Sequence, residues 1–266
     1  MKPHEEIIIQ RYVDKCIVFY GASLFVFYGF LFATVTLIPP LMHQPFPSLA
    51  EYPFDVFYQP VKTIIFASQA IAGLMLTGQL CMNVFMALLI WFASARFEIL
   101  SEELRKVTKT YHLFECIKKH QELLKYANDV SIVARPFALT TVCCSTVSLI
   151  TILLFLLKDQ SIVGIAWVCL FSSAALSEVF MYTWPAEHLI HSTNEIGHVA
   201  FEMLKKYYLI NVWKCLQIII IRSQKPITIT IPCLMPALSF NYFAAYLSTI
   251  LSYFTTLRVM MIEDAD

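Results

Sequence analysis

Three hydroxyl-bearing residues recur at every fourth position near the end of the chain, in a segment that is otherwise apolar. Ser248, Ser252 and Thr256 follow this spacing, and Met260 continues the row. Residues four apart lie on one face of an α-helix, so the spacing predicts a narrow hydroxyl stripe. Such a stripe can line a water-filled pore, where hydroxyls replace part of an ion's hydration shell. It is equally typical of packing between membrane helices, and the spacing leaves both interpretations open.

Two other groups of ionisable residues could carry chemistry. Glu178 is an acid inside an apolar segment, and such residues are functional candidates in membranes, although contact with a neighbouring hydroxyl is the structural alternative. His188, His191, Glu195 and His198 share one helix face, which is a possible zinc site but equally a row of solvated side chains. We predict no bound metal and no cofactor. The chain lacks an HExxH motif, a phosphate loop and a nucleophile elbow, so we also predict that it is not an enzyme.

Aromatic and small polar residues at helical spacing suggest an apolar cavity with a few polar groups, which suits a small apolar ligand. Packing within a helical bundle is the alternative for each residue taken singly. The candidate ligand-binding residues are Phe27, Phe30, Thr34, Gln69, Met75, Trp167 and Phe171.

The composition indicates an integral membrane protein. Of the 266 residues, 58% are hydrophobic and only 14% are charged, whereas soluble domains are about 25% charged. The 19 Lys and Arg residues balance the 19 Asp and Glu residues, so no net field attracts a polyanion and a nucleic-acid partner is excluded. The expected partner on most of the surface is the lipid bilayer.

Five apolar segments are long enough to cross a bilayer as helices, which takes about 20 residues each. They do not alternate as the strands of a membrane barrel do. We therefore predict an all-α, polytopic transmembrane helical bundle that forms a single membrane domain over residues 1–266. The predicted spans cover residues 16–38, 63–93, 136–157, 161–183 and 227–256.

The connections between these spans predict the orientation of the chain. Sixteen Lys and Arg residues lie before the first span and in the regions 94–135 and 184–226, against three in the other connections and the tail. Basic residues mark the cytosolic side. We therefore predict a cytosolic N-terminus and an extracellular C-terminus.

The two long basic connections are expected to be helical. In region 94–135 an apolar seam with spacings of three and four residues predicts one amphipathic helix that continues the second span and packs within the chain or against another subunit. In region 184–226 a second apolar face predicts another helix, with Pro226 at a helix boundary. The seam comprises Phe97, Leu100, Leu104, Val107, Tyr111 and Phe114, and the second face comprises Leu189, Ile196, Ala200, Leu204 and Tyr208. The connection 39–62 holds six of the twelve prolines and is expected to be a stiff loop, either a lid or a plain linker.

Several short motifs resemble the insect odorant receptor family, and look most like receptors of ants, bees and wasps. Taken together they extend over essentially the whole chain. The carrying residues are Glu51 to Asp55, Pro60 and Gln69; Trp184, Glu187, Leu189 and Ser192; Ile196, Gly197 and Ala200; Arg222 to Ile227; Pro236 to Ser239; and Leu247 to Thr249 with Ser252 to Arg258.

The resemblance implies a seven-helix fold, of which this chain carries the last five helices and lacks the first two. It implies a ligand-gated, non-selective cation channel in the plasma membrane of olfactory neuron dendrites, assembled as a heterotetramer with a co-receptor and opened by small volatile molecules. The last helix would line the pore, and the cytosolic helical regions 94–135 and 184–226 would form an anchor. Thr256 and Met260 fall at the position of the hydrophobic gate, where Thr256 is more polar than the family's usual Val or Leu.

Three other functions remain open at this stage. A membrane transporter would show internal repeats and broken helices, and we find no such repeat. A metabotropic seven-helix receptor needs the opposite orientation. A truncated receptor without its first two helices would be non-functional. The topology of the C-terminus separates the metabotropic receptor from the channel, and a metal analysis tests the further hypothesis of a metalloenzyme that uses His188, His191 and His198.

Overall fold

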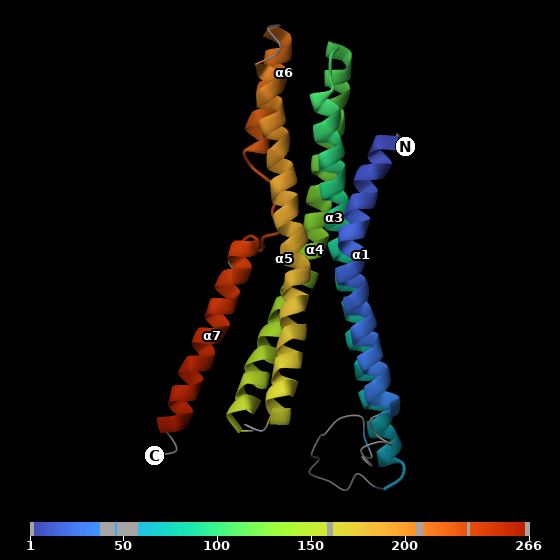
Figure 1. Cartoon of the computed structure of the whole chain (residues 1–266), viewed down its shortest axis with the longest axis vertical. Coiled ribbons are helices and arrows are strands. Elements are labelled where there is room, and N and C mark those ends of the chain that lie inside the picture. The colour runs from blue at the N-terminus through green and yellow to red at the C-terminus, as the bar shows by residue number, and fades with distance from the viewer. Residues whose placement is uncertain are drawn as a thin grey trace. The chain divides into compact units, whose positions relative to one another are not determined.

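The computed structural model describes residues 3–37, 46, 58–158, 162–205, 210–232 and 235–263, and these residues are almost entirely helical. The helices are α1 (Pro3–Phe32), with the π-helical turn η1 (Ala33–Leu37) at its end, α3 (Val61–Arg105), α4 (Thr110–Lys158), α5 (Ile162–Leu204), α6 (Ile210–Ser223) and α7 (Phe240–Glu263) (Figure 1). The fold class is therefore all-α, as predicted. The predicted loop 39–62 lies largely outside the described residues, as does Tyr208.

Four of the described helices, namely α1, α3, α4 and α5, are long and apolar enough to cross a membrane. Large apolar side chains are exposed on the surfaces of these helices: Phe25 is 80% exposed and Ile162 is 87% exposed. Apolar exposure on this scale is typical of surfaces that meet a partner or lipid. Together with the composition, it fits helices that are solvated by hydrocarbon.

The chain divides into two compact units, which we describe separately. One comprises residues 1–12 and 86–266, and the other comprises residues 13–85. In the second unit, α1 and α3 approach closely at Gly73, where a side chain would collide with Leu31. One turn of α1 earlier, the Tyr28 hydroxyl lies 3.0 Å from Cys81 Sγ.

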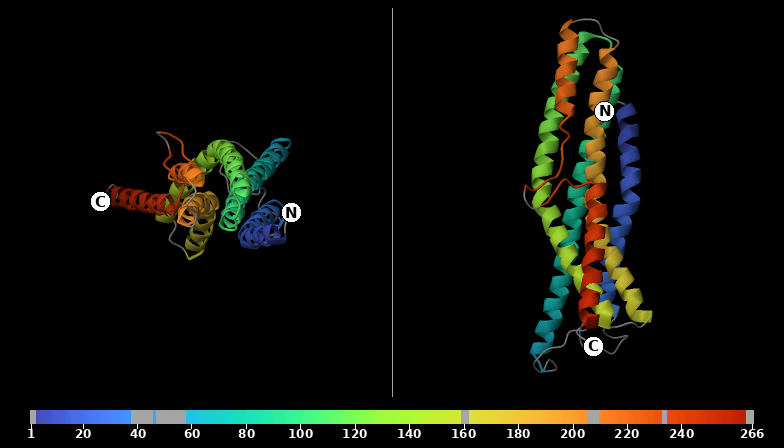
Figure 2. Two further views of the ribbon diagram at one scale, coloured as in Figure 1. Left: turned by 90° about the horizontal axis from the view of Figure 1, so that it is seen from above. Right: turned by 90° about the vertical axis from the view of Figure 1, so that its left-hand side faces the viewer.

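The first unit is built around a large core at one end of α3, α4 and α5. α6 packs against α5 and α4 at this end, whereas α7 packs on α4 and α5 along their other part (Figures 1 and 2). We call this cluster the large core. Its fully buried members include Ile90, Phe97, Ala127, Ala134, Val199, Ala200, Leu216 and Leu238.

Region 94–135 is not one helix. α3 ends at Arg105 and α4 begins at Thr110, with a turn closed by hydrogen bonds from Lys106 N and Val107 N to carbonyls three residues earlier. The seam from Phe97 to Val107 is buried in the large core, but Tyr111 is 75% exposed and Phe114 is also exposed. The expectation of a continuous seam is therefore wrong beyond Val107, because the chain reverses direction there.

The predicted span over residues 227–256 also needs correction, because α7 begins only at Phe240. The residues before it form a short hairpin, in which Ile231 and Met235 exchange backbone hydrogen bonds of 3.0 and 2.9 Å. Pro226, Pro232 and Pro236 lack the N–H that a helix requires, which explains why the apolar run does not continue as helix. This hairpin packs through Ile229 and Leu238 into the large core.

Candidate pore helix and its contacts

Helix α7 has a packed face and an open face. Tyr246 and Ile250 are buried on the packed face, against Leu149 of α4 and Val179 of α5. Tyr246 is further held by its hydroxyl, which lies 3.2 Å from Thr146 Oγ1 of α4. The spacing of four between Tyr246 and Ile250 keeps both on one side of the helix.

The predicted hydroxyl stripe lies on the opposite face. Ser248, Ser252 and Thr256 are exposed, and helical geometry places them about half a turn from Tyr246 and Ile250. The Thr256 hydroxyl donates to the Ser252 carbonyl at 2.9 Å, a bond within the helix that leaves its oxygen free to accept. Met260 belongs to α7, but its side chain lies outside the described part of the structure.

Helix α7 carries hydroxyl side chains on one face, where Ser248, Ser252 and Thr256 are exposed. A helix that faces lipid all round favours apolar side chains everywhere. A helix with one polar face in a membrane protein instead borders another helix or water. The hydroxyl face of α7 is therefore expected to border another helix or water.

Contacts from α5 hold the start of α7. Ser239 precedes the helix and accepts a hydrogen bond from Tyr242 N at 3.2 Å, as a helix N-cap does. Phe240 N, at the first position of the helix, donates to Glu187 Oε2 of α5 at 3.0 Å. The Phe180 ring of α5 stacks on Phe240, with ring centroids 6.2 Å apart.

Glu178 lies on α5 within its apolar stretch, opposite α4. The Ser145 hydroxyl of α4 donates to Glu178 Oε2 at 3.4 Å, and Ser145 is itself buried. Tyr182 and Thr141 are buried one turn away on the same two helices. This arrangement fits the structural alternative for Glu178, a carboxyl group that contacts a neighbouring hydroxyl.

His188 is engaged by aromatic rings. Its ring centroid lies 4.8 Å from that of Trp91 and 5.3 Å from that of Tyr12. His191 and His198 are exposed, and among the described residues no three His, Cys, Asp or Glu side chains are grouped as metal ligands. The geometry assigns His188 a packing role between α1, α3 and α5.

The predicted ligand-binding residues fall in both units. Phe27, Phe30, Gln69 and Met75 belong to residues 13–85, whereas Trp167 and Phe171 belong to α5 in the other unit. Phe30, Met75, Trp167 and Phe171 are exposed, and Phe27 and Gln69 are half-buried. The Trp167 and Phe171 rings stack on each other at 5.6 Å. The Thr34 side chain lies outside what the structure describes, and the shared cavity stays a prediction.

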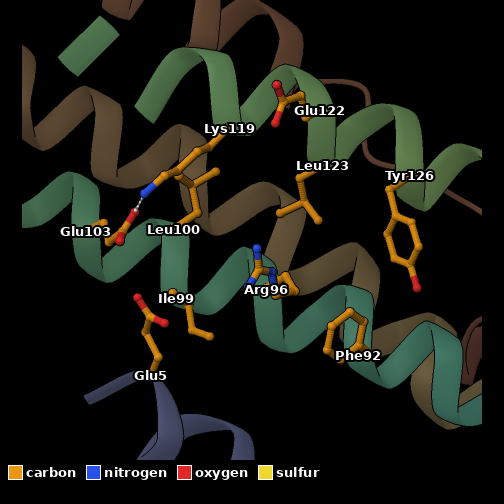
Figure 3. A pocket seen from close by; sticks show the side chains of 10 residues that line it. All are labelled: Glu5, Phe92, Arg96, Ile99, Leu100, Glu103, Lys119, Glu122, Leu123 and Tyr126. Atoms are coloured by element: carbon orange, nitrogen blue, oxygen red, sulfur yellow. Dashed lines mark hydrogen bonds and ion pairs between the residues drawn. The ribbon is translucent and has the colours of Figure 1, made fainter. Parts of the chain in front are cut away.

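A cavity of about 420 Å³ lies elsewhere, between the start of α1, the last part of α3 and the first part of α4 (Figure 3). Its lining includes the apolar side chains of Phe92 and Leu123 and an ion pair of 2.8 Å between Lys119 and Glu103. None of the predicted ligand-binding residues lines it.

The sequence model of the family described as 7tm Odorant receptor matches residues 1–251. The chain belongs to the 7tm odorant receptor family. It is therefore a multi-pass membrane protein, and its family consists of receptors rather than enzymes, as the sequence led us to expect.

Curated relatives of this odorant receptor chain are insect receptors. It is 26% identical to odorant receptor 22c of Drosophila melanogaster over 62% of its length, and 24% identical to odorant receptor Or2 of Anopheles gambiae over 55%. The aligned regions span only 40% and 38% of these two relatives.

Solved structures share the fold of this receptor chain. The insect olfactory receptor OR5 of Machilis hrabei in complex with eugenol superposes with a TM-score of 0.80 over 96% of this chain and 69% of that protein, at 18% identity. A second structure of the same Machilis hrabei receptor OR5 gives a TM-score of 0.74. At this identity the likeness establishes the helical architecture.

The attachment of α7 was not predicted from the sequence. Glu187 was named only among the residues that resemble the family, and its contact with Phe240 joins positions that are far apart in the chain. One local signal was available, since Ser239 directly before an apolar run is typical of a helix N-cap. That signal places the start of α7 but says nothing about which helix holds it.

Proposed function

We propose that this chain is a subunit of a ligand-gated, non-selective cation channel that opens when a small volatile apolar molecule binds. Its partner is a co-receptor subunit, and the two assemble as a heterotetramer in the plasma membrane of olfactory neuron dendrites. In this proposal α7 lines the pore, and Ser248, Ser252, Thr256 and Met260 face the permeating ions.

The observation that carries the proposal is the open hydroxyl face of α7. Among the described residues, α7 packs through the side of Tyr246 and Ile250, so the face of Ser248, Ser252 and Thr256 remains for a partner or for water. Around the axis of a heterotetramer, this face would line one part of the channel with hydroxyls, which can replace part of an ion's hydration shell.

The ligand would bind among Phe27, Phe30, Thr34, Gln69, Met75, Trp167 and Phe171. Eugenol, which is bound in the solved relative, is a small aromatic molecule, and an aromatic-rich cavity would suit ligands of that kind. A ligand opens the channel only to the extent that it binds the open form more tightly than the closed form.

Cysteine substitution along α7 tests the proposal. The chain and a co-receptor subunit are expressed in cells, and currents evoked by eugenol and an odorant panel are recorded before and after a positively charged thiol reagent. We expect the reagent to reduce the current of Ser248→Cys, Ser252→Cys and Thr256→Cys. Leu251→Cys and Tyr253→Cys, exposed on the two flanks of the stripe, are the matched controls.

Loss of current at the flanking positions with none at the stripe would rule out the assigned pore face. A chain that reaches the cell surface with its co-receptor and gives no current, either spontaneous or evoked across the panel, would contradict the channel function itself.

A further inference from the structure

The first turn of α7 is bonded to another helix. The first N–H groups of a helix have no partner within the helix. In α7 one of them, Tyr242 N, is satisfied locally by Ser239 Oγ at 3.2 Å. Another, Phe240 N, is satisfied by the Glu187 carboxylate of α5 at 3.0 Å. A negative charge at this end also complements the helix dipole.

Aromatic stacking reinforces this bond. Phe180 of α5 stacks on Phe240 with an interplanar angle of 13° and meets Phe243 edge-on at 5.6 Å. Phe180 also stacks on Trp184, one turn further along α5. The first turn of α7 therefore contacts α5 through one charged and several aromatic side chains.

The backbone that precedes α7 is fixed to the large core. Ile229, Met235 and Leu238 are buried there. The Ser131 hydroxyl of α4 donates to the Thr228 carbonyl at 3.0 Å. Because the chain up to Leu238 is held in the large core, a tilt of α7 is expected to pivot near its first turn.

We propose that Glu187 is a positioning residue for the pore helix. Its carboxylate ties the first turn of α7 to α5, so that a displacement of α5 tilts α7 about Phe240. The inference rests on the proposed function, because a tilt of α7 changes conduction only if α7 lines a pore.

Hydrogen exchange on the purified full chain tests the bond itself. We expect Glu187→Ala to speed exchange of the amides of residues 240–243 about tenfold, because a hydrogen bond to a charged acceptor is lost. Glu187→Gln keeps an acceptor but no charge, so its effect should be smaller. Glu202→Gln, at an exposed acid of the same helix, should leave these amides unchanged.

Phe240→Pro is combined with Glu187→Ala in a double-mutant cycle. Proline is tolerated at the first position of a helix and removes the donor N–H. Phe240→Leu keeps the N–H but loses the ring, and so separates the loss of stacking. In the Phe240→Pro background, Glu187→Ala should add no further increase at residues 241–243. Unchanged exchange in Glu187→Ala, or an equal increase in both backgrounds, would overturn the proposed bond.

Current recordings test whether the bond transmits a displacement of α5 to the pore helix α7. With eugenol and the odorant panel as probes and a co-receptor subunit present, we expect Glu187→Ala to change the ratio of evoked to spontaneous current at least threefold at equal surface density. If Glu187 had a purely structural role, Glu187→Ala would lower the surface density and leave the ratio unchanged. That result would overturn the gating role of Glu187 but not the channel function. A wild-type chain at the surface with neither spontaneous nor evoked current would instead overturn the channel function, and the gating role with it.

Discussion

At the scale of single residues, Gly197 shows how the sequence sets the distance between α5 and α6. A Cβ atom at this position would lie 2.8 Å from Ser223 Cβ and 3.4 Å from Ser223 Oγ. Ser223 Cβ is fixed to the backbone of α6, so it cannot move aside by a change of rotamer. Only a glycine allows α6 to pack this closely on α5.

We predict that Gly197→Ala destabilises the protein by about 1–3 kcal/mol, the usual cost of overpacking. Thermal unfolding of the detergent-purified chain measures the loss. Ser223→Gly should restore the melting temperature, because Ser223 is the last residue of α6, where glycine costs little. Gly78→Ala is the matched control, since nothing lies within 4 Å of that position. An unchanged melting temperature in Gly197→Ala would contradict the tight contact.

His120 is a buried histidine in the first part of α4, well before the apolar stretch that begins at Pro136. It is 5% exposed and meets the Phe97 ring edge-on at 6.4 Å. Burial, with a smaller contribution from the nearby Arg222 charge, lowers the pKa of His120 from 6.5 to about 4. The folded protein therefore holds this imidazole in its neutral form.

This shift predicts loss of stability in mild acid. The unfolded chain protonates His120 near its ordinary pKa of 6.5, whereas the folded chain does so only near pH 4. The stabilisation is complete above pH 6.5 and falls between these values by at most about 1.4 kcal/mol per pH unit. His120→Gln should flatten the decline of melting temperature between pH 7 and pH 5. Parallel profiles for the two proteins would argue against a neutral buried imidazole.

At the scale of elements, the start of α1 is tied to α3 by one carboxylate. Glu98 accepts a hydrogen bond from the buried Tyr12 hydroxyl at 2.7 Å, and Arg11 pairs with its other oxygen at 3.1 Å. The Tyr12 ring also packs edge-on against Trp91, at 5.6 Å. Because Arg11 is exposed, the Tyr12 bond is expected to contribute more than the ion pair.

We predict that Tyr12→Phe loosens the start of α1 by about 1–2 kcal/mol, since it removes a buried hydrogen bond to a charged group. Hydrogen exchange over residues 5–14 should increase about tenfold while exchange in α5 stays the same. Lys106→Ala removes an exposed ion pair of 3.3 Å with Glu102 and an exposed contact of 3.1 Å with His4 of α1, and should have little effect because both are exposed. A larger change in Lys106→Ala than in Tyr12→Phe would reverse this ranking.

Periodicity predicted the buried faces of these elements but not where they end. Phe97, Leu100 and Leu104 are buried as their spacing indicated. Tyr111 continues the same spacing and is exposed, because the register does not reveal that the chain turns after Arg105. Likewise, hydrophobicity merged the 227–238 hairpin with α7, although its prolines indicated a break.

Contacts between distant segments were beyond the reach of sequence patterns. The bonds of Glu187 with Phe240 and of Glu98 with Tyr12 join different helices. Each depends on how two helices are rotated against each other, which no local spacing encodes. The hydroxyl stripe, in contrast, was predicted because its members lie on one helix, and the structure places it on the open face.

At the scale of the whole molecule, the composition indicates a membrane fold and the distribution of charge predicts its orientation. Sixteen Lys and Arg residues flank one set of helix ends and three flank the other. Eight of the sixteen lie on α3, α4 and α6 around the large core. Those regions also contain the ion pairs of Glu103 with Lys119 and of Arg105 with Glu195, which suit contact with water rather than hydrocarbon.

We therefore predict that α7 runs from the cytosolic side outward and that a tag after Asp266 is extracellular. Positively charged loops are retained in the cytosol, and the helices attached to them must follow. Antibody staining of intact cells should detect a C-terminal tag, whereas a tag before Met1 should need permeabilised cells. Protease added to sealed cells should remove the C-terminal tag alone. The reverse pattern would place the large core outside the cell and rule out both the charge-based orientation and the pore direction assigned to α7.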